Sequence, residues 1–103
     1  ALASAANDWQ VEHWTRHEKR LHASICVPYE DPEASVREIR RRAGDPAFCQ
    51  VLLLSRTAEA LGRRRYWPIY AAAQEAGLPI GIHVFGYAGY AATSTGWPSF
   101  YIE

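Results

Sequence analysis

The chain has 103 residues, of which 49% are hydrophobic, and its eleven basic side chains balance eleven acidic ones. This composition is typical of a globular domain and argues against disorder, collagen and coiled coil. The neutral charge gives no electrostatic reason to expect nucleic acid as a partner, and no stretch approaches the roughly 20 apolar residues needed to cross a bilayer. The alanine-rich residues 1–6 lack the basic region and apolar core of a signal peptide, so we expect a cytoplasmic protein.

The first two elements expected are a helix over residues 7–19 and a short buried strand over residues 21–27. In the helix, Val11 and Trp14 have the spacing of one helical face. The strand is an apolar run that contains isoleucine and valine and ends at Pro28.

Asp31 and Pro32 predict the start of the next helix. Asp31 can accept hydrogen bonds from free backbone N–H groups, and Pro32 suits the first helical position, where no donor is needed. Arginines at 40–42 fall in the last turn, and Gly44 suits the left-handed residue that commonly ends a helix.

The second half of the chain predicts two more strands with a helix between them. We expect a strand over residues 48–54, a helix over residues 66–76 that Gly77 ends, and a strand over residues 80–84. The following loop, residues 86–96, is rich in glycine and tyrosine. It suits a flap over a pocket, or a connection whose aromatic side chains pack on a missing partner, and a further helix is expected to start after it.

Strands that are apolar throughout belong to parallel sheets, which right-handed crossovers connect. The expected class is therefore α/β, with about three parallel strands and crossover helices, and residues 1–103 form a single incomplete domain. Both outer strands would leave open backbone edges that the first helix and the trailing loop cover little, so a partner is implied: a second copy or a missing part of the protein. The chain contains no methionine, and we expect it to be a piece of something longer.

The carboxyl ends of parallel strands are the functional side of such a sheet, and His83 lies at one of them. An imidazole has no packing reason to end an apolar strand, and Gly81 lets another group approach that strand closely. His83 is thus a candidate metal ligand or general base. The alternative is a half-buried histidine bonded to a neighbouring carbonyl.

The arginines after the second strand are candidates for binding an acidic substrate. Arg63, Arg64 and Arg65 stand before a helix, where the positive end of its dipole disfavours cations, so an anion is expected nearby. That anion is either a substrate carboxylate or acidic side chains of neighbouring loops. Arg56, directly beyond the strand, is a further candidate, although a surface salt-bridge network remains the alternative for all four.

Other histidines and both cysteines are expected to be structural. His13 and His17 have metal-ligand spacing but no glutamate after the first histidine, and a solvated face is expected; His22 lies at the amino end of its strand. Cys26 and Cys49 sit in apolar runs, where a free cysteine behaves as a small buried hydrophobe.

Several segments resemble the amidohydrolase-related branch of the metal-dependent hydrolases, which includes aminocarboxymuconate-semialdehyde decarboxylase and related aromatic-acid decarboxylases. The resemblance covers residues 7–103. The segments are Gly44-Asp45-Pro46, Val51-Leu52-Leu53-Leu54, Gly62-Arg63-Arg64-Arg65-Tyr66-Trp67-Pro68-Ile69-Tyr70, Gly77-Leu78-Pro79-Ile80-Gly81-Ile82-His83 and Gly96-Trp97-Pro98-Ser99.

This resemblance implies part of a (β/α)₈ barrel, from about the third to the fifth strand, in which His83 matches the metal ligand that ends the fifth strand. It also implies a divalent metal, usually zinc, and a small carboxylate-bearing substrate that is hydrolysed or decarboxylated. The sequence lacks the family's His-x-His pair, its later histidine and its final aspartate. Because a catalytic zinc normally has three protein ligands, we expect the chain by itself to be inactive.

Two other functions remain open from the sequence. One is a non-catalytic α/β module that self-associates through its strand edges and binds a small anion with its arginines. The other is a small doubly wound ligand-binding domain, although the chain has no phosphate-binding loop and few strands for that fold.

Overall fold

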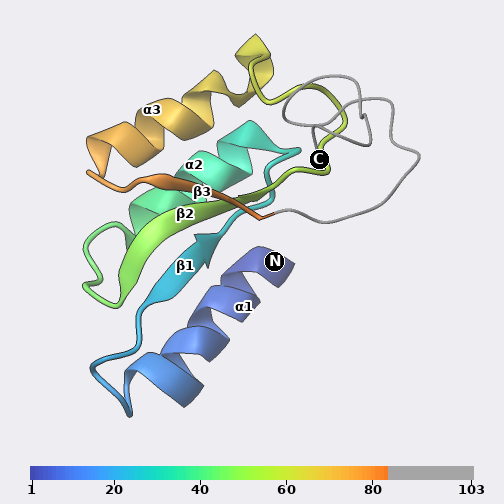
Figure 1. The fold of residues 1–103 in the computed structure, drawn as a ribbon. Coiled ribbons are helices and arrows are strands. Elements are labelled where there is room, and N and C mark those ends of the chain that lie inside the picture. The colour runs from blue at the N-terminus through green and yellow to red at the C-terminus, as the bar shows by residue number, and fades with distance from the viewer. Residues whose placement is uncertain (84–103) are drawn as a thin grey trace, which may run out of the picture.

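The computed structural model describes residues 1–83, in which three parallel strands form one sheet in the order β1–β2–β3 (Figure 1). The α/β prediction is therefore confirmed. The helices are α1 (Leu2–Gln10), α2 (Pro32–Arg42) and α3 (Trp67–Glu75), the strands are β1 (Ala23–Cys26), β2 (Phe48–Leu54) and β3 (Ile80–His83), and two short turns are the π-helical η1 (Val11–Thr15) and the 3₁₀-helical η2 (Arg64–Tyr66).

The first helix differs from its prediction at both ends. It begins at Leu2 rather than near Asn7, and it continues through η1 to end at Thr15 rather than near residue 19. Asn7 is therefore inside the helix, where it is completely buried. Its polar side chain does not start the helix because it is bonded to the neighbouring strand.

That bonding covers the outer edge of β1, so the prediction that the first helix covers little is wrong for this strand. The Asn7 side chain accepts a hydrogen bond from the backbone N–H of Cys26 (2.8 Å) and donates one to the Cys26 carbonyl (2.9 Å). Gln10 donates to the carbonyl of Ser24 (3.1 Å). Figure 1 shows α1 running alongside β1, on the side away from β2.

The start of α2 agrees with the prediction from the sequence, whereas its end does not. Asp31 accepts a hydrogen bond from the N–H of Ala34 (3.0 Å), and Pro32 occupies the first helical position. The residue after the helix, Ala43, has a right-handed helical backbone, and the φ of Gly44 is not positive. The prediction that a left-handed Gly44 ends this helix is therefore wrong. Among residues 1–83 only Gly77 has a positive φ, +67°, and it follows α3 as predicted.

Strand β2 has the predicted bounds, but it contains an irregularity that changes the environment of Cys49. Ala23 pairs with Phe48 whereas Ser24 pairs with Gln50, so Cys49 is an additional residue in β2. Cys49 is exposed, and the prediction that it is buried is wrong. Cys26 is partly buried, and burial raises the pKa of its thiol, which fits a structural cysteine.

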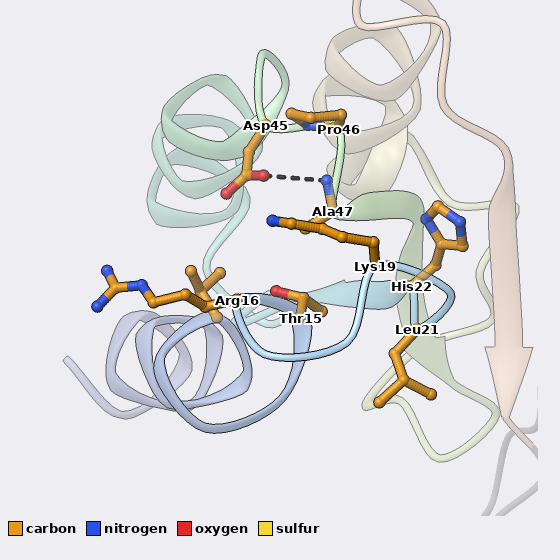
Figure 2. A pocket seen from close by; sticks show the side chains of 9 residues that line it. Thr15, Arg16, Lys19, Leu21, His22, Asp45, Pro46 and Ala47 are labelled. Atoms are coloured by element: carbon orange, nitrogen blue, oxygen red, sulfur yellow. Dashed lines mark hydrogen bonds between the residues drawn. The ribbon is translucent and has the colours of Figure 1, made fainter.

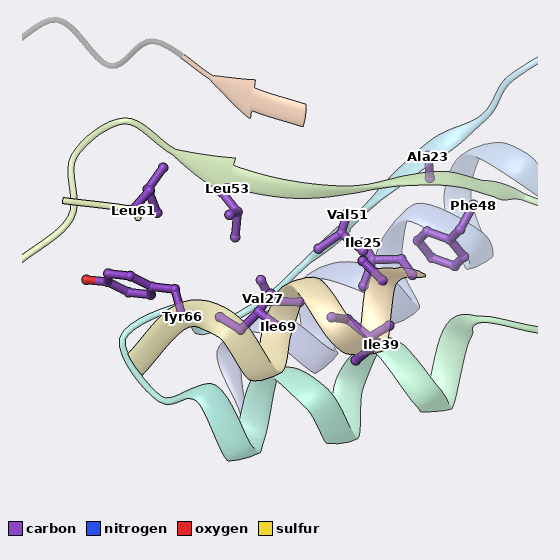
Figure 3. Close-up of a cluster of buried hydrophobic side chains, with 12 residues drawn as sticks. Ala23, Ile25, Val27, Ile39, Phe48, Val51, Leu53, Leu61, Tyr66 and Ile69 are labelled. Atoms are coloured by element: carbon purple, nitrogen blue, oxygen red, sulfur yellow. The ribbon is translucent and has the colours of Figure 1, made fainter. Parts of the chain in front are cut away.

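The hydrophobic core lies between the sheet and the pair α2 and α3 (Figure 3). Each strand sends alternate side chains to this face, as the two-residue period of a strand requires. The completely buried members are Ile25, Ile39, Val51, Leu53, Tyr66 and Ile69. The opposite face of the sheet is covered by neither α2 nor α3.

Three predicted features lie outside the described residues: the last residue of the third strand, the glycine-rich loop at 86–96 and the helix expected after it. None of the helices within residues 1–83 has the length and hydrophobicity needed to span a bilayer.

Candidate functional site

His83 is the last residue of β3 and pairs with Leu54, the last residue of β2. Its carbonyl accepts a hydrogen bond from the N–H of Ser55 (3.0 Å), which holds the end of β3 against the loop that follows β2. Ile80 packs against the core, so alternation places Gly81 and His83 on the other face of the sheet. His83 is exposed there, at the carboxyl end.

Gly81 accommodates the side chain of Gln50 on this same face. A Cβ atom on Gly81 would lie 2.6 Å from the Gln50 side-chain oxygen, closer than such atoms approach in proteins. The Gln50 amide also donates to the Ser24 hydroxyl (2.8 Å), so this side chain bonds β1 and lies against Gly81 of β3. The close approach predicted at Gly81 is therefore confirmed, and the approaching group is Gln50.

The loops after β1 and β2 are joined by Glu30 and Tyr66. Tyr66 is completely buried, and its hydroxyl donates to the Glu30 carboxylate (3.2 Å) and accepts from the N–H of Glu59 (3.3 Å). The N–H of Ala58 donates to the same carboxylate (2.8 Å). Burial raises the pKa of Tyr66, so its hydroxyl is a protonated donor at neutral pH.

Two of the predicted arginines are paired with acidic groups of these loops. Arg65 lies 2.9 Å from the carboxylate of Glu59 and 3.3 Å from that of Glu30, and its hydrogen bond to Glu59 raises its pKa further. Arg63 lies 4.0 Å from Glu59. The anion expected beside the triplet is thus present as loop carboxylates, one of the two alternatives.

The other two arginines are held differently. Arg64 lies over the ring of Trp67, 5.5 Å from its centroid. Arg56 lies two residues after the end of β2, and its backbone carbonyl accepts a hydrogen bond from the hydroxyl of Tyr29 (3.1 Å). Arg56 is therefore fixed at the carboxyl edge of the sheet, the same edge that carries His83.

The remaining histidines do not assemble a metal site. His13 lies against the ring of Trp9 (5.5 Å between centroids), and the Nε2 of His17 bonds the carbonyl of Glu12 (2.9 Å). No three His, Cys, Asp or Glu side chains within residues 1–83 are grouped so that they could hold a metal ion.

Sequence reasoning missed a buried polar cluster between α1 and α2. The Glu38 carboxylate, only 5% exposed, accepts hydrogen bonds from Asn7 (2.8 Å), Ser4 (2.7 Å) and Arg41 (2.6 Å). Burial raises the pKa of Glu38, but these three donors outweigh it and lower the pKa below its ordinary value. Nothing in the sequence marked Glu38, because a glutamate inside a charged helix looks like part of a solvated face.

Comparison with known proteins decides the family. The family model for amidohydrolases matches residues 1–99. The chain belongs to the amidohydrolase family. No curated protein sequence matches it.

Two solved amidohydrolase-type structures share its fold. A 5-carboxyvanillate decarboxylase variant from Novosphingobium aromaticivorans, with bound manganese and 3-methoxy-4-hydroxy-5-nitrobenzoic acid, is 32% identical with a TM-score of 0.72; the match covers 80% of this chain and 24% of that one. A Staphylococcus aureus protein assigned to the amidohydrolases is 25% identical with a TM-score of 0.77; the match covers 88% of this chain and 30% of that one. The chain therefore spans less than a third of either relative.

The sheet is thus part of a (β/α)₈ barrel, as the sequence predicted. In such a barrel the helices form the outer layer, so the face without α2 and α3 is the interior. His83 then lies inside the barrel at the carboxyl ends of the strands, where the active sites of this fold are found. A neutral imidazole in that position fits a metal ligand.

Proposed function

We propose that this chain is part of a metal-dependent enzyme that hydrolyses or decarboxylates a small carboxylate-bearing substrate. Family membership supports the reaction class, and the decarboxylase with manganese and a substituted benzoic acid supports both a divalent metal and an aromatic acid as substrate class. The position of His83 carries the proposal, because it is the histidine that the structure places at the carboxyl end of a strand, on the sheet face away from α2 and α3.

His83 would supply one metal ligand through its imidazole. A catalytic zinc normally has three protein ligands, and residues 1–83 contain no group of three suitable side chains. We therefore expect this chain to be inactive without further ligands. When bound, the metal would act as a Lewis acid toward water or a substrate oxygen. Zinc is the ion that we propose, and manganese in the decarboxylase is the ion to compare with it.

Arg56 would bind the carboxylate of the substrate. It lies two residues after Leu54, the last residue of β2, and Leu54 pairs with His83, so Arg56 and His83 lie near adjacent strand ends. A guanidinium can hold a carboxylate through two parallel hydrogen bonds. Arg63, Arg64 and Arg65 would add positive charge at the rim, although Arg65 already bonds two loop carboxylates.

The test is the metal content and activity of the complete enzyme that contains this chain, with 5-carboxyvanillate as the first substrate. His83→Ala should lower bound zinc or manganese at least tenfold and abolish turnover. His13→Ala is the matched control, because His13 is exposed on the first helix and should leave both unchanged. Full activity in His83→Ala would overturn the ligand assignment.

Arg56→Gln should raise KM for the acidic substrate at least tenfold while metal content stays unchanged. Its matched control is Arg37→Gln, an exposed arginine of α2. An unchanged KM in Arg56→Gln would remove this arginine from the site without affecting the assignment of His83.

The alternative of a self-associating module makes a different prediction. A native mass spectrum of the purified protein reports copy number and bound metal together. Metal-free oligomers of an 11.6 kDa chain would favour that alternative. The edge of β1 is already bonded by α1, so pairing between copies through that edge is not expected.

A further inference from the structure

Arg56 is held through its backbone by the loop that follows β1. The hydroxyl of Tyr29, three residues after the end of β1, donates a hydrogen bond to the Arg56 carbonyl (3.1 Å). Tyr29 is partly buried and packs against the hydrophobic core, so its ring has a fixed position from which the hydroxyl reaches the neighbouring loop. One side chain therefore connects the loops after two adjacent strands, at the arginine proposed to bind the substrate.

The turn that carries Tyr29 is closed by its own hydrogen bonds. The N–H of Tyr29 bonds the Val27 carbonyl (2.9 Å), and the N–H of Asp31 bonds the Pro28 carbonyl (2.7 Å). The Asp31 side chain also caps α2, so this turn is fixed at the end of β1 and at the start of the helix. A tyrosine on such a turn can determine where the backbone of a neighbouring loop lies.

The loop after β2 is bonded on both sides of Arg56. On the amino side, the N–H of Ser55 bonds the His83 carbonyl (3.0 Å). On the carboxyl side, the N–H of Ala58 bonds the Glu30 carboxylate (2.8 Å). The tyrosine hydroxyl acts between these two fixed points, on the backbone of Arg56 itself.

The amino ends of the strands show a different kind of side-chain bond. In the hollow between η1 and the turn before β2, the bond drawn in Figure 2 stays within one turn: the Asp45 carboxylate accepts from the N–H of Ala47 (3.0 Å). The bonds from Tyr29 and Glu30 instead join two different loops. Such joining is needed where side chains from several strands act on one substrate, which in this fold is the carboxyl edge.

We propose that Tyr29 is a positioning residue that fixes the backbone of Arg56 for binding the carboxylate of the substrate. This inference rests on the proposed function, in which Arg56 binds that carboxylate. A guanidinium pairs with a carboxylate through two parallel hydrogen bonds, a geometry that depends on where its backbone lies. Fixing this backbone in advance removes the cost of ordering the loop during binding.

The test compares Tyr29→Phe with the wild type in the complete enzyme, with 5-carboxyvanillate as substrate. The variant keeps the ring that packs against the core and removes only the hydroxyl. KM should rise about threefold or more while kcat and bound metal stay unchanged, because only the binding of the carboxylate is weakened. Tyr70→Phe is the matched control and should leave KM unchanged, because the Tyr70 hydroxyl bonds a carbonyl of the same loop at Leu61, farther along the chain from Arg56.

A double variant shows whether Tyr29 acts through Arg56. In Arg56→Gln the guanidinium is absent, so the addition of Tyr29→Phe should not raise KM further. The inference alone is overturned if Arg56→Gln raises KM whereas Tyr29→Phe does not, if the two fold-changes multiply in the double variant, or if Tyr70→Phe raises KM as much as Tyr29→Phe. An unchanged KM in Arg56→Gln would instead refute the proposed role of Arg56, and the inference would fall with it.

Discussion

The side-chain amide of Asn7 bonds both backbone groups of Cys26, its N–H at 2.8 Å and its carbonyl at 2.9 Å. A single carboxamide thus takes the position that the peptide group of a neighbouring strand would take in a wider sheet. The same amide also donates to Glu38 (2.8 Å), so Asn7 joins α1, β1 and α2.

Asn7→Leu should destabilise the fold strongly. The substitution leaves the backbone N–H and carbonyl of Cys26 without their side-chain partner, at a cost of about 1–3 kcal/mol for each buried group. It also removes one of the three side chains that donate to the Glu38 carboxylate. We expect the free energy of unfolding in urea to fall by about 3 kcal/mol or more. Gln10→Leu is the control, because it removes fewer contacts from a half-buried position, and it should cost about 1 kcal/mol. Equal losses in the two variants would contradict the role of Asn7.

Glu38→Gln should change the dependence of stability on pH. The folded pKa of Glu38 is lowered, so the unfolded carboxyl takes up its proton at a higher pH than the folded one. The stabilisation is therefore complete above about pH 5 and is lost as the pH falls through the folded pKa. At pH 7 the variant should lose about 2 kcal/mol, the scale of a hydrogen bond to a charged group.

The difference between Glu38→Gln and the wild type should shrink as the pH is lowered, which thermal melts from pH 7 to pH 3 would measure. Glu33→Gln is the control, because Glu33 is exposed and its only described ion pair, with Arg37, spans 4.0 Å. A pH-independent difference for Glu38→Gln would show that its charge does not stabilise the fold.

Gly81→Ala should be destabilising because of Gln50. The added methyl group would displace the Gln50 side chain and break its bond to Ser24, and overpacking of this kind costs about 1–3 kcal/mol. In the double variant with Gln50→Ala most of this loss should be recovered, which a double-mutant cycle of unfolding free energies would reveal. Gly44→Ala is the control, since an added methyl group there would meet no other group within 4 Å and the φ of Gly44 is not positive.

Tyr66→Phe should loosen the loop after β2 without unfolding the protein. The ring stays in the core, but the Glu30 carboxylate and the Glu59 N–H lose the hydroxyl that connects them, at a cost of about 1 kcal/mol. Amide hydrogen exchange at Ala58 and Glu59 should accelerate. Tyr70→Phe is the control, because the Tyr70 hydroxyl bonds the Leu61 carbonyl instead; faster exchange at the same two amides in both variants would argue against a specific link through Glu30.

Where neighbouring residues determine the start or the bounds of an element, the sequence was sufficient to predict them. Asp31 and Pro32 start α2 as predicted, and the apolar run of β2 has the predicted bounds. These features depend on neighbours in the sequence: a capping side chain, a proline without a donor, and a run of branched side chains. The parallel order of the sheet followed from the same apolar strands.

What the sequence could not predict depends on distant partners. Asparagine is a residue type that often starts a helix, yet Asn7 is buried inside α1. It is buried there because it bonds Cys26 of β1 and Glu38 of α2. Cys49 is exposed because β2 holds one more residue than its partner strand, a feature of pairing rather than of composition. For the candidate site, the sequence proposes Arg65 and His83 from their positions, but the pairing of Arg65 with Glu30 could be seen only in the fold.

The bonding of α1 to the edge of β1 also affects how the chain can fold while it is being synthesised. The ribosome releases the amino-terminal end first, so the residues of α1 emerge before those of β1. Only residues 11–22 separate α1 from β1, and such a short connection closes quickly. The amides of Asn7 and Gln10 are thus available as soon as Ser24 and Cys26 leave the exit tunnel. The outer edge of β1 can therefore be bonded within the same chain, which leaves fewer free backbone groups for another nascent chain to pair with.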